Sequence, residues 1–252
     1  MGTPMDKVII FLGPTLPVAD AQEVLDAEYR PPVAQGDVLR AVAEKPKAIG
    51  IIDGYFENTP AVWHKEILYA LTNGVRVFGS ASMGALRAAE LDAFGMEGVG
   101  AIFQAYKDGR LEDDDEVAVT HGPAEIGFPI LTEAMVNIRR TFSDAFAAGV
   151  LDEPARRGLE QIAKGLHYKE RTYARIFRMG REAGIAAYRI DALLSWLPHG
   201  RADQKREDAL AMLRRMRLEG EKGWTPAAPL FPFEHTAPFA AALHGAMAGG
   251  VG

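Results

Sequence analysis

The sequence contains no cysteine among its 252 residues. This absence excludes disulfide bonds, thiolate metal ligands, a cysteine nucleophile and a persulfide carried on this chain. It is typical of proteins from a reducing compartment, and we expect the chain to be cytoplasmic.

Long apolar runs and an excess of basic residues are missing as well. The apolar run in the amino-terminal stretch MGTPMDKVIIFLGP is too short for a signal peptide. No segment approaches the roughly 20 apolar residues of a membrane helix. Lys and Arg number 28 against 34 Asp and Glu, which gives a net charge of −6. Such a balance disfavours nonspecific binding to nucleic acid or to an anionic membrane. We expect neither as a partner.

The usual nucleotide-binding motifs are also missing. No G-x-x-x-x-G-K-[ST] occurs, and the turn Gly13-Pro14-Thr15 lacks the G-x-G-x-x-G spacing. The acidic run at 113–116 favours a solvated turn over a metal site, because consecutive acids rarely face one ion. We therefore expect no cofactor and no metal on this chain.

Short apolar segments and helix-like segments alternate in the first half. Each apolar run is rich in Val and Ile and is closed by turn residues, as buried parallel strands are. The expected strands are 7–12, 48–53, 75–79 and 116–120, and the expected helices are 20–28, 36–44, 60–73 and 83–94. The pattern predicts an α/β fold, Rossmann-like, with a mostly parallel sheet of four to five strands and helices on both faces.

The pattern changes after residue 128 and becomes almost entirely helical. Expected helices are 129–148, 153–166, 169–184 and 201–219. We expect an α/β core at 1–128, a helical region at 129–222, and a tail rich in Pro, Ala and Gly at 223–252 that is partly ordered at best. The basic run at 205–217 is interpreted as a solvated helix face, with a docking surface for an acidic partner as the alternative.

Polar loops follow the four expected strands and should meet at one edge of the sheet, where ligands of parallel sheets collect. Gly13 and Thr15 follow the first strand and could donate hydrogen bonds to an anion. Asp53 ends the second strand and could orient a base or bind a cation, or it could cap the following turn. These three residues are candidate substrate-binding residues.

Ser82 lies at a corner between the third strand and the next helix, in the pentad Ser80-Ala81-Ser82-Met83-Gly84. This order resembles the nucleophile elbow G-x-S-x-G, with serine in place of the first glycine. The N–H of Met83 would face a developing oxyanion at the helix start. The alternative is a serine that caps the helix without chemistry.

A nucleophilic serine needs a base, and three residues are candidates. His64 and Lys65 lie in the first turns of the helix after the second strand, and His121 closes the fourth expected strand. The field of a helix amino terminus would depress the pKa of Lys65 toward a useful range. The alternatives are a surface lysine paired with Glu66 or Asp53, and a loop histidine bonded to backbone.

Arg87 comes one turn after the serine corner. Its guanidinium could clamp a carboxylate, such as the carboxyl terminus of a protein, through two parallel hydrogen bonds. The alternative is an ion pair with Glu90 at a spacing of three residues.

Six blocks in residues 7–130 resemble the TfuA-like family. They are FLGPTL, PPVAQGD, IGIIDGYF, VWHKEILYAL, GSASMGALRAAELDAFGMEGVG and DDEVAVTHGP, in that order. The resemblance implies a partner of the YcaO enzymes, which use ATP to activate a backbone amide and install a thioamide in a peptide or protein. It further implies sulfur supply from the thiocarboxylated carboxyl terminus of a small ubiquitin-like carrier, with a precursor peptide as a further partner.

Three functions are compatible with these observations. The first is a thiocarboxylate hydrolase that releases sulfide for a YcaO enzyme, with Ser82, the Met83 N–H and Lys65 or Arg87 in the site. The second is a non-catalytic adaptor that docks the carrier or the peptide onto the YcaO enzyme. The third is a general serine hydrolase, although no acid–histidine pair in the usual order is evident after Ser82.

Overall fold

The computed structural model describes residues 6–55, 57, 59–229 and 231–248. The chain divides into two compact units. The first comprises residues 1–112 together with 206–252, and the second comprises residues 113–205. The expected boundaries at 128 and 222 therefore differ from the structural ones, because the last long helix and the carboxyl-terminal segment return to the first unit.

The first unit is built on a five-stranded, all-parallel sheet with strand order β2-β1-β3-β4-β5. The strands are β1 (Val8–Phe11), β2 (Glu28–Arg30), β3 (Ala48–Ile51), β4 (Arg76–Ser80) and β5 (Glu97–Val99). The predicted fold class is confirmed. The strand order reverses between β1 and β3, which makes the carboxyl ends of these two strands the topological switch point of the sheet.

The strand predicted at 116–120 is wrong. This segment lies in the second unit, where a short 3₁₀ turn (Asp114–Glu116) is followed by irregular chain. Glu116 is buried and its carboxylate accepts two hydrogen bonds from Arg139, which fixes the segment against a helix rather than in the sheet. The edges of the sheet are formed instead by β2 and β5, whose sequences contain no apolar run that would predict a strand.

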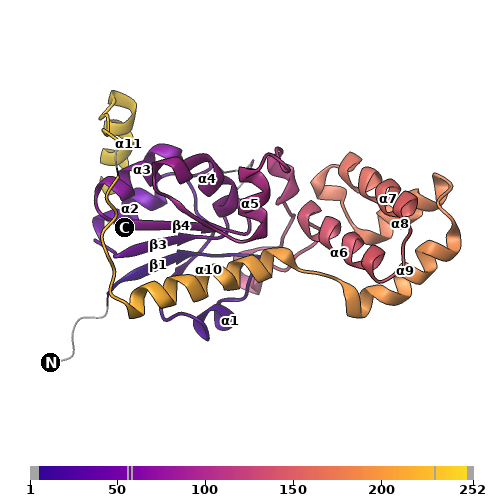
Figure 1. Cartoon of the computed structure of the whole chain (residues 1–252). Coiled ribbons are helices and arrows are strands. Elements are labelled where there is room, and N and C mark those ends of the chain that lie inside the picture. The colour runs from indigo at the N-terminus through magenta and orange to yellow at the C-terminus, as the bar shows by residue number, and fades with distance from the viewer. Residues whose placement is uncertain (1–5, 56, 58, 230, 249–252) are drawn as a thin grey trace. The chain divides into compact units, whose positions relative to one another are not determined.

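Helices cover both faces of the sheet (Figure 1). On one face lie α1 (Val18–Gln22) and α10 (Gln204–Glu221), and on the other lie α2 (Asp37–Ala43), α3 (His64–Thr72) and α4 (Met83–Leu91), with α5 (Ala101–Lys107) packed beside α4. Met212 and Met216 of α10 reach the sheet at Gly50, where an added Cβ would lie 3.0 Å from each of them. The core between α10 and the sheet is therefore formed by residues about 160 positions apart.

Helix α3 begins at residue 64, four residues later than the expected helix at 60–73. The carbonyl of Pro60 accepts a hydrogen bond from the N–H of Gln35, so the chain up to Trp63 is tied to a neighbouring loop and is not helical. Glu66 is within reach of the N–H of Trp63, at 3.4 Å, and completes the helix start.

The second unit is helical, as predicted. Its helices are α6 (Met135–Ala147), α7 (Glu153–Gly165), α8 (Tyr173–Glu182) and α9 (Ala187–Gly200), and short 3₁₀ turns occur at Ala124–Ile126 and Tyr168–Glu170. Ile138 and Phe142 of α6, four residues apart on one side of the helix, are fully buried in its core. Helix α6 begins at residue 135 and not at 129, because the chain before it folds back through an antiparallel bridge between His121 and Ile130.

The carboxyl-terminal segment is more ordered than expected. After α10 the chain crosses the first unit and forms α11 (Ala237–Ala248) against α2. A further 3₁₀ turn follows α4 at Asp92–Phe94. Residues 230 and 249–252 of the expected tail lie outside the described residues.

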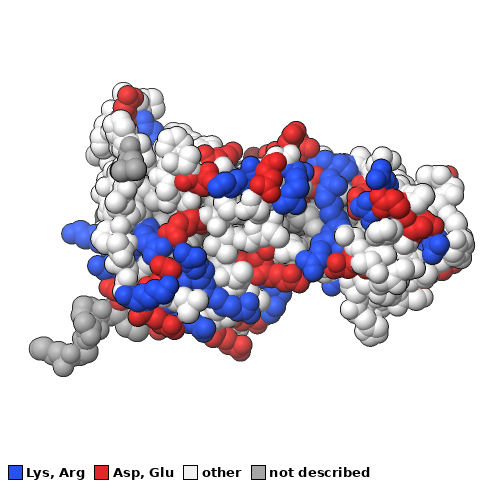
Figure 2. Space-filling view, in the orientation of Figure 1, with Lys and Arg blue, Asp and Glu red and all other residues white. Residues whose placement is uncertain are grey.

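Charged side chains of both signs are intermingled on the face shown in Figure 2. On α10 they form local pairs, such as Arg206 with Asp20 at 2.9 Å and Arg215 with Glu219 at 3.1 Å. The opposite side of α10 is buried on the sheet, so the structure agrees with a solvated charged face. None of the helices in the described ranges has the length and apolar character needed to span a bilayer.

Candidate functional site

The corner between β4 and α4 is a tight, strained turn. Ala81 has a φ of 65°, and the N–H of Ser82 donates to the carbonyl oxygen of Ser80 at 2.7 Å. This is a γ-turn with a left-handed central residue, a rare form. Positive φ at a residue other than glycine costs of order 1–3 kcal/mol and occurs often at functional sites. Ala81 is fully buried, so the surrounding packing holds the strain.

The hydroxyl of Ser82 is not used by the fold. Ser82 occupies the N-cap position of α4, but its side chain makes no capping hydrogen bond, and no partner for it exists among the described residues. It is 8% exposed. The capping alternative is therefore not realised, and the hydroxyl remains available to a ligand.

Ser80 is the structural serine of this corner. Its hydroxyl lies 2.7 Å from the carbonyl oxygen of Val99 and 2.9 Å from that of Asp208, and the residue is fully buried. The two serines therefore differ in role: Ser80 joins β4 to β5 and α10, and Ser82 lies at the start of α4, just after the carboxyl end of β4.

The start of α4 provides amide donors next to Ser82. The first N–H groups of a helix have no acceptor within the helix. That of Gly84 donates to the carbonyl oxygen of Ile52 at 3.3 Å, whereas that of Met83 has no acceptor within the described part of the chain. The N–H of Met83 is the group expected to stabilise an oxyanion, and the geometry leaves it free to do so.

Gly13, Thr15 and Asp53 meet at the switch point between β1 and β3. Asp53 is buried and accepts hydrogen bonds from the N–H of Gly13 at 2.9 Å, the N–H of Thr15 at 3.0 Å and the hydroxyl of Thr15 at 2.6 Å. The sequence placed these residues together correctly. Their donors, however, are taken up by the carboxylate of Asp53, which closes the loop after β1 onto the loop after β3.

His64 and Lys65 sit at the start of α3, as predicted, but neither forms a hydrogen bond with Ser82. The Nε2 atom of His64 lies 2.7 Å from a carboxylate oxygen of Glu90 on α4. The amine of Lys65 donates to the hydroxyl of Thr236 at 3.1 Å, in the carboxyl-terminal segment. The expected alternative partners of Lys65, Glu66 and Asp53, are engaged elsewhere.

Arg87 belongs to the same cluster as His64. Its guanidinium donates to Glu90 at 2.8 Å and to the carbonyl oxygen of Val62 at 3.2 Å. The structure therefore contains the ion pair between Arg87 and Glu90 that the sequence analysis gave as the alternative to a carboxylate clamp. Glu90 therefore joins a candidate base and a candidate carboxylate clamp from two different helices.

His121 lies in the second unit, in the loop before α6. Its Nδ1 atom is 2.8 Å from the carbonyl oxygen of Gly122, and its ring packs edge-on against Phe128 with centroids 5.3 Å apart. This is the loop histidine bonded to backbone that the sequence left as an alternative.

Glu66 is a buried acid that the sequence did not single out. It is fully buried, and its carboxylate accepts from the N–H of Gly36, at 2.8 and 2.9 Å from its two oxygens. Burial raises the pKa of Glu66, and hydrogen bonds from backbone N–H groups only partly oppose it. The position of Glu66 three residues after Trp63 could have predicted its role at the start of the helix. Its contact with Gly36 could not be predicted, because the two residues are 30 positions apart and no local pattern connects them.

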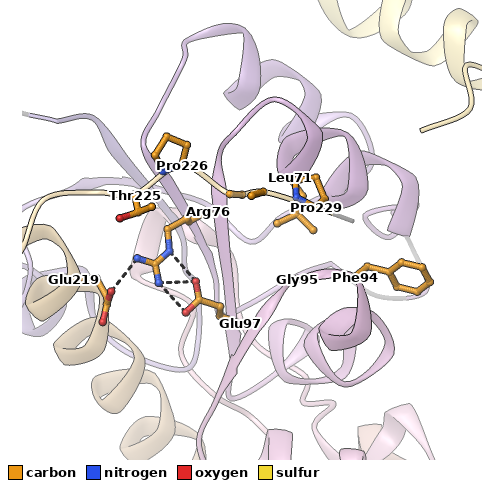
Figure 3. Close-up of a pocket in the computed structure, with 11 residues that line it drawn as sticks. Leu71, Arg76, Phe94, Gly95, Glu97, Glu219, Thr225, Pro226 and Pro229 are labelled. Atoms are coloured by element: carbon orange, nitrogen blue, oxygen red, sulfur yellow. Dashed lines mark hydrogen bonds and ion pairs between the residues drawn. The ribbon is translucent and has the colours of Figure 1, made fainter. Parts of the chain in front are cut away.

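A pocket of about 380 Å³, whose lining residues are drawn in Figure 3, lies where β4 and β5 begin. Ser82 follows the other end of β4. Its polar wall is Arg76 at the start of β4, with Glu97 and Glu219. The guanidinium donates to Glu97 at 2.8 Å through both Nε and one terminal nitrogen and to Glu219 at 3.0 Å through the other. These bonds satisfy the charged groups internally. Within the described residues, no group of three or more His, Asp or Glu is placed to hold a metal ion.

Fold and site together define a parallel α/β protein that presents an unpartnered serine at a strained strand-to-helix corner. The family model described as TfuA-like protein matches residues 53–172. This match confirms the resemblance: over residues 53–172, just under half of the chain, the sequence is similar to the TfuA-like family. The match begins just after β3, the third strand along the chain, and it extends into the helical unit, beyond the last block recognised in the sequence. No curated protein matches the chain.

Proposed function

We propose that this chain is a sulfur-delivery partner in ATP-dependent backbone thioamidation by a YcaO enzyme, and that it hydrolyses a thiocarboxylated ubiquitin-like carrier to release sulfide. The TfuA-like match supports the pathway, because this family is associated with thioamidation. ATP would be used by the YcaO partner.

The observation that carries the catalytic part is the free hydroxyl of Ser82 beside the free N–H of Met83. In the proposed reaction, the oxygen of Ser82 attacks the thiocarboxylate carbon, and the oxyanion faces the N–H of Met83 at the start of α4. The carbon–sulfur bond breaks, and sulfur leaves as HS⁻ with the proton of the hydroxyl. Water then hydrolyses the ester, which regenerates Ser82 and leaves the carrier as a carboxylate. In the variant of this scheme without a covalent step, Ser82 holds the attacking water instead.

The test is sulfide release from a purified thiocarboxylated carrier. Ser82→Ala should lower the rate by about 100-fold or more, the scale seen when a nucleophile or oxyanion donor is removed. Ser195→Ala, at an exposed serine whose hydroxyl donates to the backbone of Asp191, is the matched control and should leave the rate unchanged. An unchanged rate in Ser82→Ala would remove the serine from the mechanism.

One observation favours the adaptor alternative. Neither His64 nor Lys65 forms a hydrogen bond with Ser82, and both are held by other groups. A docking protein would need no base. It predicts that Ser82→Ala and Lys65→Ala leave sulfide release untouched while they weaken capture of the carrier or of the YcaO enzyme in a pull-down.

A further inference from the structure

The carboxyl-terminal strap, residues 224–229 and 231–248, crosses the first unit and ends in α11 (Figure 1). It contains no Lys or Arg and a single acid, Glu234. Within the described residues, one backbone hydrogen bond ties it to the rest of the chain, from the N–H of Ala227 to the carbonyl oxygen of Gly74. Its attachment therefore depends on side chains.

Those side chains are mostly aromatic. Phe233 packs against Tyr69 of α3 with ring centroids 5.7 Å apart, and against Phe239 of α11 at 4.9 Å. Phe239 is almost fully buried and lies in a cluster with Leu39 of α2. The strap thus places a small aromatic cluster on the outer side of α2 and α3.

Lys65 is half-buried and lies against this cluster. Its amine donates to the hydroxyl of Thr236 and lies over the rings of Phe233 and Phe239, 5.5 and 5.7 Å from their centroids. A cation in the first turn of a helix is electrostatically disfavoured. The aromatic faces and the hydroxyl oxygen offset this cost, so the strap stabilises Lys65 in a place where α3 alone would not.

Trp224 anchors the start of the strap on Phe78 of the sheet, with ring centroids 6.2 Å apart. Beyond this anchor the strap is held by one backbone hydrogen bond, ring contacts and the small apolar cluster of α11 on α2, so it opens at a lower free energy than the core on which it lies. When the strap lifts, Lys65 loses its partners and its charge becomes available to an anionic group. We propose that the strap is a reversible cover that withholds Lys65 while it is closed. The opening of the strap does not depend on the proposed function. Only its expected effect on sulfide release rests on the proposed function.

The absence of cysteine makes opening measurable with one introduced thiol. Ala246 is buried on the inner side of α11, and Ala248 is exposed two residues further on. Ala246→Cys should react with a thiol reagent at least about tenfold more slowly than Ala248→Cys, because its reaction requires an opened strap. Adding Phe233→Ala should raise the rate of Ala246→Cys by up to about tenfold. His244→Ala, an exposed position on the same helix, is the matched control and should not change it.

Acylation of lysines by an amine reagent gives a second readout in the otherwise unmodified chain. Phe233→Ala should raise the labelling of Lys65 and leave that of the exposed Lys47 unchanged. Equal reactivity of the two introduced thiols, or labelling of Ala246→Cys and Lys65 that does not respond to Phe233→Ala, would overturn the cover. Increased labelling with unchanged sulfide release would support the cover and remove Lys65 from the proposed function.

Discussion

The N–H of Gly84 donates to the carbonyl oxygen of Ile52 at 3.3 Å, which seats the first turn of α4 directly on the end of β3. A Cβ at Gly84 would come within 1.7 Å of the carbonyl oxygen of Ile51. The obstacle is backbone in the middle of the sheet, so it cannot turn aside as the end of a side chain can. The position of Ser82 therefore depends on a glycine two residues later.

We expect Gly84→Ala to destabilise the protein by about 3 kcal/mol, at the upper end of what overpacking usually costs. It should also lower sulfide release, because α4 must move away from β3 and carries Ser82 and the N–H of Met83 with it. Gly245→Ala is the control, since a Cβ there meets nothing within 4 Å. Chemical denaturation measures the difference, and equal stability of the two variants would contradict the close approach.

Removal of the hydroxyl should lower the stability of the protein at Ser80 but not at Ser82. Ser80→Ala leaves the carbonyl oxygens of Val99 and Asp208 without this donor and should cost about 1–2 kcal/mol. Ser82→Ala breaks no hydrogen bond within the described structure and should change the free energy of unfolding by less than about 0.5 kcal/mol. Thermal or chemical unfolding of both variants checks this, and a Ser82→Ala variant as unstable as Ser80→Ala would show that its hydroxyl is structural.

The central strands could be predicted from sequence because each is a short β-branched run closed by turn residues. The edge strands β2 and β5, with sequences EYR and EGV, could not, because an edge strand of three residues buries too little surface to need an apolar pattern. At 116–120 the sequence predicted a strand that does not exist. An alternating apolar pattern shows only that one side of the segment is buried, and in the second unit this side is buried against helices instead of in a sheet.

The candidate site was predictable where it depends on chain direction alone. Parallel strands bring the loops after β1, β3 and β4 to one edge, so Thr15, Asp53 and Ser82 were placed at that edge together. The partner of Lys65 was not predictable, since Thr236 lies 171 positions away and the strap carries no motif. Contacts of that range are decided by packing, which a local pattern does not encode.

Glu66 should make stability depend on pH. Its buried carboxylate has a pKa above the ordinary value in the folded state, so the native protein binds more protons than the unfolded chain in the window between the two values. The free energy of unfolding then falls as the pH rises through that window. Glu66→Gln removes this titration, and its stability relative to the wild type should improve as the pH increases from about 4 to 8.

The control for this effect is Glu125→Gln, at an exposed acid, whose difference from the wild type should be flat. Glu66→Ala should cost about 2–3 kcal/mol at low pH, because it leaves the buried N–H of Gly36 without its acceptor, and this cost should shrink as the pH rises because the same carboxyl is removed. A pH-independent difference between Glu66→Gln and the wild type would contradict the raised pKa.

Arg171 should be the least replaceable charge of the second unit. Its side chain is fully buried and donates to the carboxylate of Asp115 at 2.6 Å and to the carbonyl oxygens of Ala163, Leu166 and Asp115 at 3.0 to 3.1 Å. Arg171→Lys keeps the charge but lacks the planar array of donors, and it should cost about 3–5 kcal/mol. Arg178→Lys, at an exposed position, should change little. Hydrogen exchange of α7 measures the local effect, and unaltered protection would contradict this role.

Asp53 occupies a place that an external anion could otherwise take. Two backbone N–H groups and one hydroxyl, from Gly13 and Thr15, converge on its carboxylate. Asp53→Ala should therefore cost about 3 kcal/mol and open a site for a small carboxylate. Formate should raise the Tm of Asp53→Ala in proportion to the logarithm of its concentration, because it binds only the folded state. The wild type, whose donors are already engaged, should respond to formate no more than to chloride at equal ionic strength. An equal response of the two proteins would mean that the donors of Gly13 and Thr15 are open to ligands in the wild type. The loop after β1 would then again be a candidate substrate-binding element.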